Sequence, residues 1–258
     1  GRKLAERGQW PELVKVIELE LSGLKDPAER ARAAFHLGEV YENRLSQADR
    51  ALAAYEQALV AVPEFRPAAD GRSRLLTLAR DYKRLAEDLA REVSSAGDPV
   101  VAMVALFRQG ELFRDELGDT RRAIESFEGV LSRDPSHLGA LLALEPLYTE
   151  VGAWEPLARI FATEARVLTD SGARGAALKE LARLEEIRGV GKPEEIRAAY
   201  ISVLQLAPAD PGALFALERI ALAAGDPQLL THVGAKPGAT PSSPTLAAVH
   251  QTRLAEAL

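Results

Sequence analysis

The sequence predicts an all-α protein built as an array of antiparallel helix pairs. Apolar residues make up 47% of the chain but aromatic residues only 5%, so Ala and Leu dominate the apolar content. Ala, Leu, Glu and Arg are all strong helix formers. The sequence also repeats itself at a fixed interval, and its prolines fall near predicted helix starts, where a missing N–H is harmless. Together these observations favour helix pairs that stack on one another.

The internal repeat has a period of 72 residues, and a third copy follows at a shift of 73. A fixed period of this kind is typical of a solenoid or array. Each block divides into two similar halves, so the repeating unit is a helix pair of about 34–36 residues. The positions that coincide at the first shift are Gly38 and Gly110, Tyr41 and Phe113, Ala51 and Ala123, Tyr55 and Phe127, Leu59 and Leu131, and Pro63 and Pro135.

One element of the repeat occurs three times, each time starting with an aromatic residue. The copies are "WPELVKVIELE" from Trp10, "YKRLAEDLARE" from Tyr82 and "WEPLARIFATE" from Trp154. We interpret the three rings as packing between successive units, because packing accounts directly for their period. A platform on which a ligand stacks is the alternative.

Capping signals and the repeat together place the helices along the chain. Asp-Pro pairs at 26–27, 98–99 and 210–211 each indicate a cap followed by the first helical residue. Pro146 is the exception, because it falls inside a stretch that should be helical, so we expect a kink or a shifted helix start there. The expected helices span 10–22, 27–46, 48–61, 67–80, 82–95, 99–117, 119–132, 136–151, 153–169, 172–189, 193–206, 210–224, 226–232 and 245–257.

The pattern of small, aromatic and proline residues resembles the tetratricopeptide repeat, over nearly the whole chain to about residue 230. The residues that match it most closely are Leu37, Gly38, Tyr41, Ala51, Tyr55, Ala58 and Pro63. The resemblance implies a right-handed superhelical solenoid of antiparallel helix pairs, with about 13–14 helices. The alternate units carry Ser73, Glu145 and Glu218 where the small Gly is expected, so their helices should approach less closely.

The resemblance also implies a domain organisation. We expect one array over 1–232, a loop rich in Pro, Gly and Ser over 233–244, and a terminal helix over 245–258 that could start a further unit. Neither end of the chain reads as a polar cap, so we expect the chain to be a piece of a longer array. Within the array, a partial unit at 1–25 precedes units at about 27–63, 65–96, 99–135, 136–170, 172–208 and 210–232.

The charge and composition exclude several classes of function. A formal net charge of -6 argues against nucleic-acid binding, which usually needs a clustered basic surplus. The chain has no cysteine, and no apolar run is long enough to span a membrane. We therefore expect a cytoplasmic protein, with the periplasm as the alternative, and the Arg-rich, Lys-poor usage favours a bacterial source.

A search for catalytic, cofactor and metal sites predicts none. His36, His137, His232 and His250 have no ligand spacing. The stretch "GVGKPEE" lacks the first Gly and the Ser or Thr of a phosphate loop, and the adjacent Glu pairs point in different directions on a helix. There is no nucleophile elbow and no dinucleotide fingerprint. We expect a protein without enzymatic activity.

The resemblance places the binding surface on the first helix of each pair, which lines a concave groove. We expect the groove to hold an extended or helical peptide, with a modest acidic surplus that favours partners with basic segments. On this interpretation Glu42→Lys should alter partner binding and leave stability nearly unchanged. The residues implied for the groove are Arg32, Phe35, Glu39, Glu42 and Asn43, then Val104, Phe107, Glu111, Arg114 and Asp115, then Leu181, Glu185 and Arg188.

The predicted function is a non-catalytic scaffold that binds a partner protein or peptide. The groove charges could instead merely keep the concave face soluble, or the convex face could bind. A second class of function remains open, in which the array is the targeting or regulatory arm of a larger enzyme, or of a ligand sensor, whose active domain lies outside this sequence.

Overall fold

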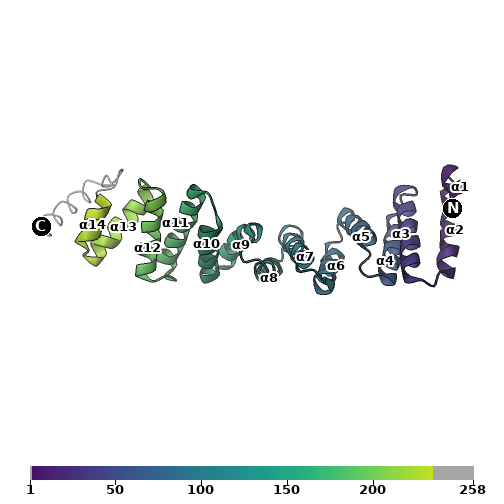
Figure 1. The fold of residues 1–258 in the computed structure, drawn as a ribbon, viewed down its shortest axis with the longest axis horizontal. Helices are drawn as coiled ribbons and strands as arrows, with labels where there is room; N and C mark the ends of the chain where they lie inside the picture. The colour runs from purple at the N-terminus through teal and green to yellow at the C-terminus, as the bar shows by residue number, and fades with distance from the viewer. Residues whose placement is uncertain (1, 235–258) are drawn as a thin grey trace. The chain divides into compact units, whose positions relative to one another are not determined.

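The computed structural model of the chain describes residues 2–234, and all regular elements in this range are helical (Figure 1). The helices group into two compact units, Gly1–Gly118 and Asp119–Leu258, which we call the N-terminal and C-terminal units. The elements are α1 (Arg2–Glu6), α2 (Trp10–Gly23), α3 (Pro27–Asn43), α4 (Ala48–Ala61), α5 (Arg66–Leu78), α6 (Tyr82–Ser95), α7 (Pro99–Leu112), a π-helical turn η1 (Phe113–Leu117), α8 (Thr120–Leu131), α9 (Leu138–Val151), α10 (Trp154–Val167), α11 (Ser171–Arg188), α12 (Pro193–Leu206), α13 (Pro211–Ala224) and α14 (Pro227–Gly234).

The helix starts follow the capping chemistry of the sequence. The carboxylate of Asp26 accepts from the amide of Glu29 at 3.0 Å, and Asp210 accepts from Ala213 at 2.8 Å. In both cases a proline occupies the first turn, where its missing N–H leaves no hydrogen bond unmade. The helix ends are equally specific, since Gly152 ends α9 with φ of 69°, a left-handed conformation that costs glycine little.

The predicted helices between residues 10 and 232 are confirmed to within a few residues, with three differences. The short α1 was not predicted. The helix expected over 99–117 ends at Leu112 and continues as η1, because a π-helical turn accommodates one extra residue. α9 runs through Pro146 without a new start, since Pro146 and Leu142 are exposed and water can reach the carbonyl that the proline leaves unpaired. The loop and helix expected over 234–257 lie outside the described residues, apart from Gly234 at the end of α14.

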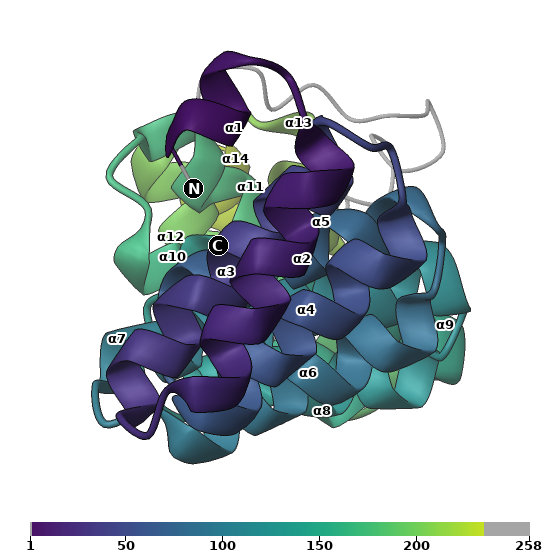
Figure 2. The ribbon, with the colours of Figure 1, turned by 90° about the vertical axis from the view of Figure 1, so that its right-hand side faces the viewer.

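A single tyrosine ring organises the core of the N-terminal unit. Tyr55 of α4 is fully buried and is enclosed by two glycines of neighbouring helices. A Cβ atom on Gly38 of α3 would lie 2.4 Å from Tyr55 Cε1, and one on Gly71 of α5 would lie 2.8 Å from the ring. The small residue of α5 is therefore Gly71, two positions before Ser73, and the expectation that α5 lacks such a residue is wrong. Figure 2 shows α2, α3 and α4 packed side by side in this unit.

The three aromatic residues that begin the second helices are contacted by side chains of the next helix pair. The guanidinium of Arg44 lies 4.9 Å from the ring centre of Trp10, and that of Arg188 lies 3.9 Å from the ring centre of Trp154. Glu116 occupies the corresponding place beside Tyr82, where its hydrogen bond raises the pKa of the phenol. These contacts support the packing interpretation over a ligand platform, because an adjacent unit already covers each ring.

The C-terminal unit has a continuous apolar core from α11 to α14. Tyr200 and Leu204 of α12 meet Leu214 and Leu217 of α13, and Leu230 of α14 closes the cluster. The spacing of these residues places one apolar stripe on each helix, which only a neighbouring helix can bury.

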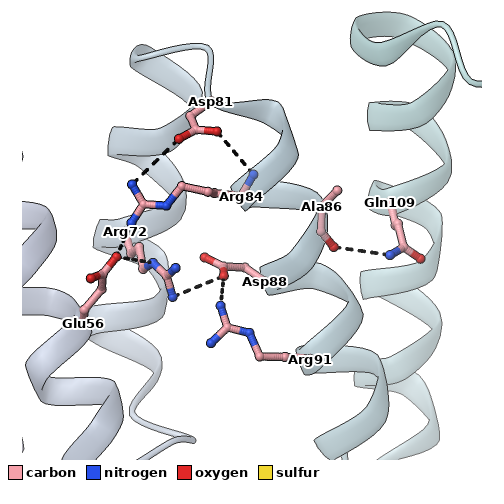
Figure 3. A network of polar contacts seen from close by, with 8 residues as sticks. All are labelled: Glu56, Arg72, Asp81, Arg84, Ala86, Asp88, Arg91 and Gln109. Atoms are coloured by element: carbon pink, nitrogen blue, oxygen red, sulfur yellow. Dashed lines mark hydrogen bonds and ion pairs between the residues drawn. The ribbon is translucent and has the colours of Figure 1, made fainter.

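A buried arginine replaces a core leucine in the N-terminal unit. Arg72 of α5 is almost fully buried, whereas Leu144 occupies the corresponding position 72 residues later. Its guanidinium lies 3.1 Å from Asp88 of α6 and 3.5 Å from Glu56 of α4 (Figure 3). Burial raises the pKa of the Asp88 carboxyl, and the nearby arginines oppose that shift. The network therefore ties three helices together at a position that the repeat otherwise fills with an apolar side chain.

Candidate functional site

The predicted groove residues of α3 divide into exposed and packed side chains. Arg32 and Asn43 are exposed, and Glu39 is half-buried. Phe35 is half-buried because its ring packs against Tyr55, with ring centres 5.7 Å apart, and against the edge of Phe65 at 5.8 Å. Phe35 thus belongs largely to the internal aromatic cluster, while Arg32, Glu39 and Asn43 form the accessible stripe.

Glu42 is a structural residue of the N-terminal unit. Its carboxylate accepts a hydrogen bond from the buried Tyr55 hydroxyl at 2.6 Å and two from Arg74 of α5, at 2.9 and 2.7 Å. The hydrogen bonds from Arg74 are the main reason that the pKa of Glu42 is lowered. Only 14% of the Glu42 side chain is exposed. These contacts indicate that Glu42→Lys would lower stability, contrary to the expectation that stability stays nearly unchanged, while the role of Glu42 in binding stays a prediction.

The same three-residue arrangement occurs in the C-terminal unit. Tyr200 of α12 donates to Glu186 of α11 at 3.3 Å, and Arg219 of α13 pairs with the same carboxylate. We call each set a Tyr–Glu–Arg triad. A triad joins the first helix of one pair to the first helix of the next through a carboxylate that also holds the tyrosine between them.

The groove residues predicted in α11 lie close to the triad, but Glu186, the triad carboxylate, was not among them. Glu185 is half-buried, and its pKa is raised by burial and by the nearby Glu195. Arg188 lies over the Trp154 ring. Lys179, Arg183 and Glu186 are three or four residues apart, so they share one stripe of α11.

The repeat between the two triads has lost all three members. A shift of 72 residues replaces Tyr55 by Phe127, Glu42 by Arg114, and Arg74 by Pro146. Phe127 has no hydroxyl, so this repeat needs no carboxylate acceptor at the position equivalent to Glu42. Arg114 instead donates to Asp115 at 2.7 and 2.9 Å, within η1.

The remaining predicted residues of this repeat lie on α7. Phe107 and Glu111 are half-buried, and Val104 is half exposed. They are three or four residues apart, so one stripe of α7 carries them.

Two ion pairs align α11 with α13 in the C-terminal unit. Lys179 Nζ lies 2.8 Å from Asp210 Oδ2 at the start of α13, and Glu186 pairs with Arg219 near its end. Arg183 lies between the two bridges on α11 and is exposed. We call this surface the α11–α13 face. It was missed in the sequence because the bridging partners are more than thirty residues apart.

A buried carboxyl pair lies elsewhere in the C-terminal unit. Glu164 of α10 is only 4% exposed, and its Oε1 has no hydrogen-bond partner among the described residues. Burial, together with a hydrogen bond to Glu145 of α9, raises the pKa of Glu164 to about 8. The corresponding glutamate of the preceding repeat, Glu92, pairs with Arg66, whose own counterpart is Leu138. Glu164 therefore occupies a glutamate position from which the cation has been removed.

We expect Glu164→Gln to stabilise the C-terminal unit by about 1–3 kcal/mol near pH 8 and by much less near pH 5. Below the ordinary glutamate pKa both folded and unfolded states hold the proton. As the pH rises from about 4.5 toward about 8, the unfolded chain ionises while the folded chain keeps the proton, so stability falls. Glutamine cannot ionise, so the variant does not lose this stability.

Denaturant unfolding at several pH values, followed by the fluorescence of Trp154 in a Trp10→Phe background, measures this effect. Glu155→Gln, an exposed position on the same helix, is the control. A stability difference between Glu164→Gln and the parent that does not grow between pH 5 and pH 8 would contradict the expectation.

The comparisons with known proteins agree with the helix-pair architecture. A family model for the tetratricopeptide repeat matches residues 104–137. Residues 104–137 are therefore similar to one tetratricopeptide repeat. No curated protein matches the sequence.

Several solved structures are similar to the chain. A tetratricopeptide repeat protein from Parabacteroides merdae is 15% identical, with 98% of this chain and 94% of that chain covered and a TM-score of 0.41. YrrB, described as a TPR protein with an unusual peptide-binding site, is 14% identical over 72% of this chain and 91% of its own, with a TM-score of 0.41. PilW, described as a type IV pilus biogenesis factor, is 19% identical over 85% and 97%, with a TM-score of 0.35.

Among residues 2–234, no group of three or more His, Cys, Asp or Glu side chains could hold a metal ion. No helix in the same range is long and apolar enough to cross a membrane.

Proposed function

We propose that the protein is an interaction scaffold that holds a segment of a partner protein along the first helices of its pairs. The observation that carries the proposal is the pair of Tyr–Glu–Arg triads. Each triad links two successive first helices through a half-buried carboxylate, which pairs with a buried tyrosine and an exposed arginine, and leaves other polar residues of the same helices exposed. A rigid surface of this kind can bind a peptide without first paying to order its own side chains.

The tetratricopeptide match supports the proposal, because repeats of this family typically act as scaffolds without catalytic groups. In the N-terminal unit we place the partner over Arg32, Glu39 and Asn43 of α3, and over Glu111 of α7. Glu39 and Glu111 outnumber Arg32 among these residues, so this surface favours a partner segment that carries basic side chains.

The test is selection of peptides from a random displayed library on the purified chain, followed by affinity measurements on variants. We expect basic peptides to be enriched, and Glu39→Lys to weaken their binding by about tenfold. Glu87→Lys, an exposed charge reversal on the second helix α6, is the matched control and should leave the affinity unchanged. Failure to enrich any peptide, or equal weakening by both variants, would contradict the proposal.

A further inference from the structure

We propose that the α11–α13 face binds a partner segment that presents a carboxylate next to a large apolar side chain. The inference rests on the proposed scaffold function and gives one surface of the scaffold a partner of different chemistry. It depends on three features of that face: its rigid alignment, its uncompensated cation and its exposed aromatic ring.

The alignment of the face comes from the two bridges. Lys179 and Glu186 are two helical turns apart on α11, and their partners Asp210 and Arg219 are spaced similarly along α13. The side chain of Lys179 also lies against Gly212, where an added Cβ would be 3.7 Å from Lys179 Cδ. The part of α11 between Lys179 and Glu186 is therefore held to α13 at both ends by ion pairs.

Arg183 lies between Lys179 and Glu186 on α11, and its positive charge is not paired within the α11–α13 face. It is exposed, and no ion pair or hydrogen bond joins its side chain to another residue in the described part of the chain. The carboxylates of Asp210 and Glu186 already accept from Lys179 and Arg219. The face thus has three cations and two occupied carboxylates, although the whole chain has a net charge of -6.

Phe215 supplies the apolar contact. It lies on α13 between Asp210 and Arg219, and 44% of it is exposed. Ile187, one turn beyond Arg183 on α11, is 61% exposed. Exposed aromatic and arginine side chains are both enriched at protein interfaces.

These features select one kind of partner. A phosphate group carries about two negative charges and would lie close to the carboxylates of Glu186 and Asp210, which repel it. A single carboxylate can pair with Arg183 without excess charge, and an adjacent leucine or phenylalanine of the partner can cover Phe215. The cation of Arg183 also disfavours the basic segments proposed for the N-terminal unit.

The experiment measures fluorescence anisotropy of labelled probe peptides, with blocked ends, on the full chain. One probe alternates Asp and Leu, a second alternates Lys and Leu, and a third alternates Asp and Ser. We expect the Asp–Leu probe to bind at least about tenfold more tightly than either of the others. Equal or tighter binding of the Lys–Leu probe would overturn the inference.

Variants then show whether the Asp–Leu probe binds at Arg183 and Phe215. We expect Arg183→Glu to weaken the Asp–Leu probe by about tenfold or more, and Phe215→Ser to weaken it by about fivefold. Arg159→Glu, a charge reversal at an exposed position on the second helix α10, is the matched control. Arg183 and Phe215 are exposed, so thermal unfolding of each variant should match the parent and separates binding from folding.

The outcomes distinguish this inference from the proposed function. Suppose that Glu39→Lys weakens the binding of library peptides, while Arg183→Glu and Phe215→Ser leave the affinity of the Asp–Leu probe unchanged. The α11–α13 inference then fails and the scaffold function stands. If the Asp–Leu probe binds through Arg183 and no library peptide depends on Glu39, the surface proposed in the N-terminal unit is wrong and the α11–α13 inference stands.

Discussion

Gly38→Leu is expected to lower the free energy of unfolding of the N-terminal unit by about 1–3 kcal/mol or more. Even the first added carbon would lie 2.4 Å from Tyr55 Cε1. The ring cannot move aside, because Gly71 encloses its other face and its hydroxyl is held by Glu42. The cost is therefore overpacking, which outweighs the gain of about 1 kcal/mol that a glycine-to-leucine change usually brings within a helix.

Denaturant unfolding followed by Trp10 fluorescence, in a Trp154→Phe background, measures this loss. Gly23→Leu is the matched control, because no atom lies within 4 Å of the Cβ that it adds. A second experiment combines Gly38→Leu with Tyr55→Leu. If the leucine clashes with the Tyr55 ring, the effects of the two changes on the free energy of unfolding should be strongly non-additive. The packing argument is refuted if Gly38→Leu and Gly23→Leu have the same effect.

The positions that pack the repeats could be predicted from the sequence. Gly38, Ala51 and Tyr55 recur at a fixed period, and the structure buries all three. Their roles follow from size alone, since a small residue and a ring can share a helix crossing only in one arrangement. The helix starts were equally predictable, because Asp26 and Asp210 satisfy the first amides by contacts within a single turn.

The residues that connect one repeat to the next could not be predicted. Glu42 and Arg74 are 32 residues apart, and Glu186 and Arg219 are 33 apart. Whether such side chains meet depends on the exact rotation of each helix, and the π-helical turn η1 shows that single extra residues change the register between repeats.

The same sensitivity explains why the sequence did not single out Glu186. Neighbouring residues of a helix point about 100° apart, so the predicted Glu185 and the triad residue Glu186 lie on different faces. The sequence did contain one usable signal. Tyr55 and Tyr200 occupy equivalent positions, and a buried tyrosine hydroxyl needs an acceptor, which points to a glutamate on the preceding helix in both repeats.

Glu42→Lys is expected to destabilise the N-terminal unit by about 2–4 kcal/mol. The change removes the acceptor of the Tyr55 hydroxyl, which lies in a fully buried side chain. Burial and the hydrogen bond to Glu42 raise the pKa of Tyr55, so the hydroxyl keeps its proton and remains a donor without a partner in the variant. The new ammonium would also face Arg74, which loses both of its hydrogen bonds to the carboxylate.

The Tyr55→Phe background separates these two costs. Without the hydroxyl, Glu42→Lys should cost less, because only the pairing with the half-exposed Arg74 is lost. This background resembles the middle repeat, in which phenylalanine and arginine occupy the corresponding positions at Phe127 and Arg114. Glu39→Lys, on the same helix, is the matched charge reversal. Trp10 fluorescence in denaturant again gives the measurement, and a loss no larger for Glu42→Lys than for Glu39→Lys would show that the triad does not hold α3 to α5.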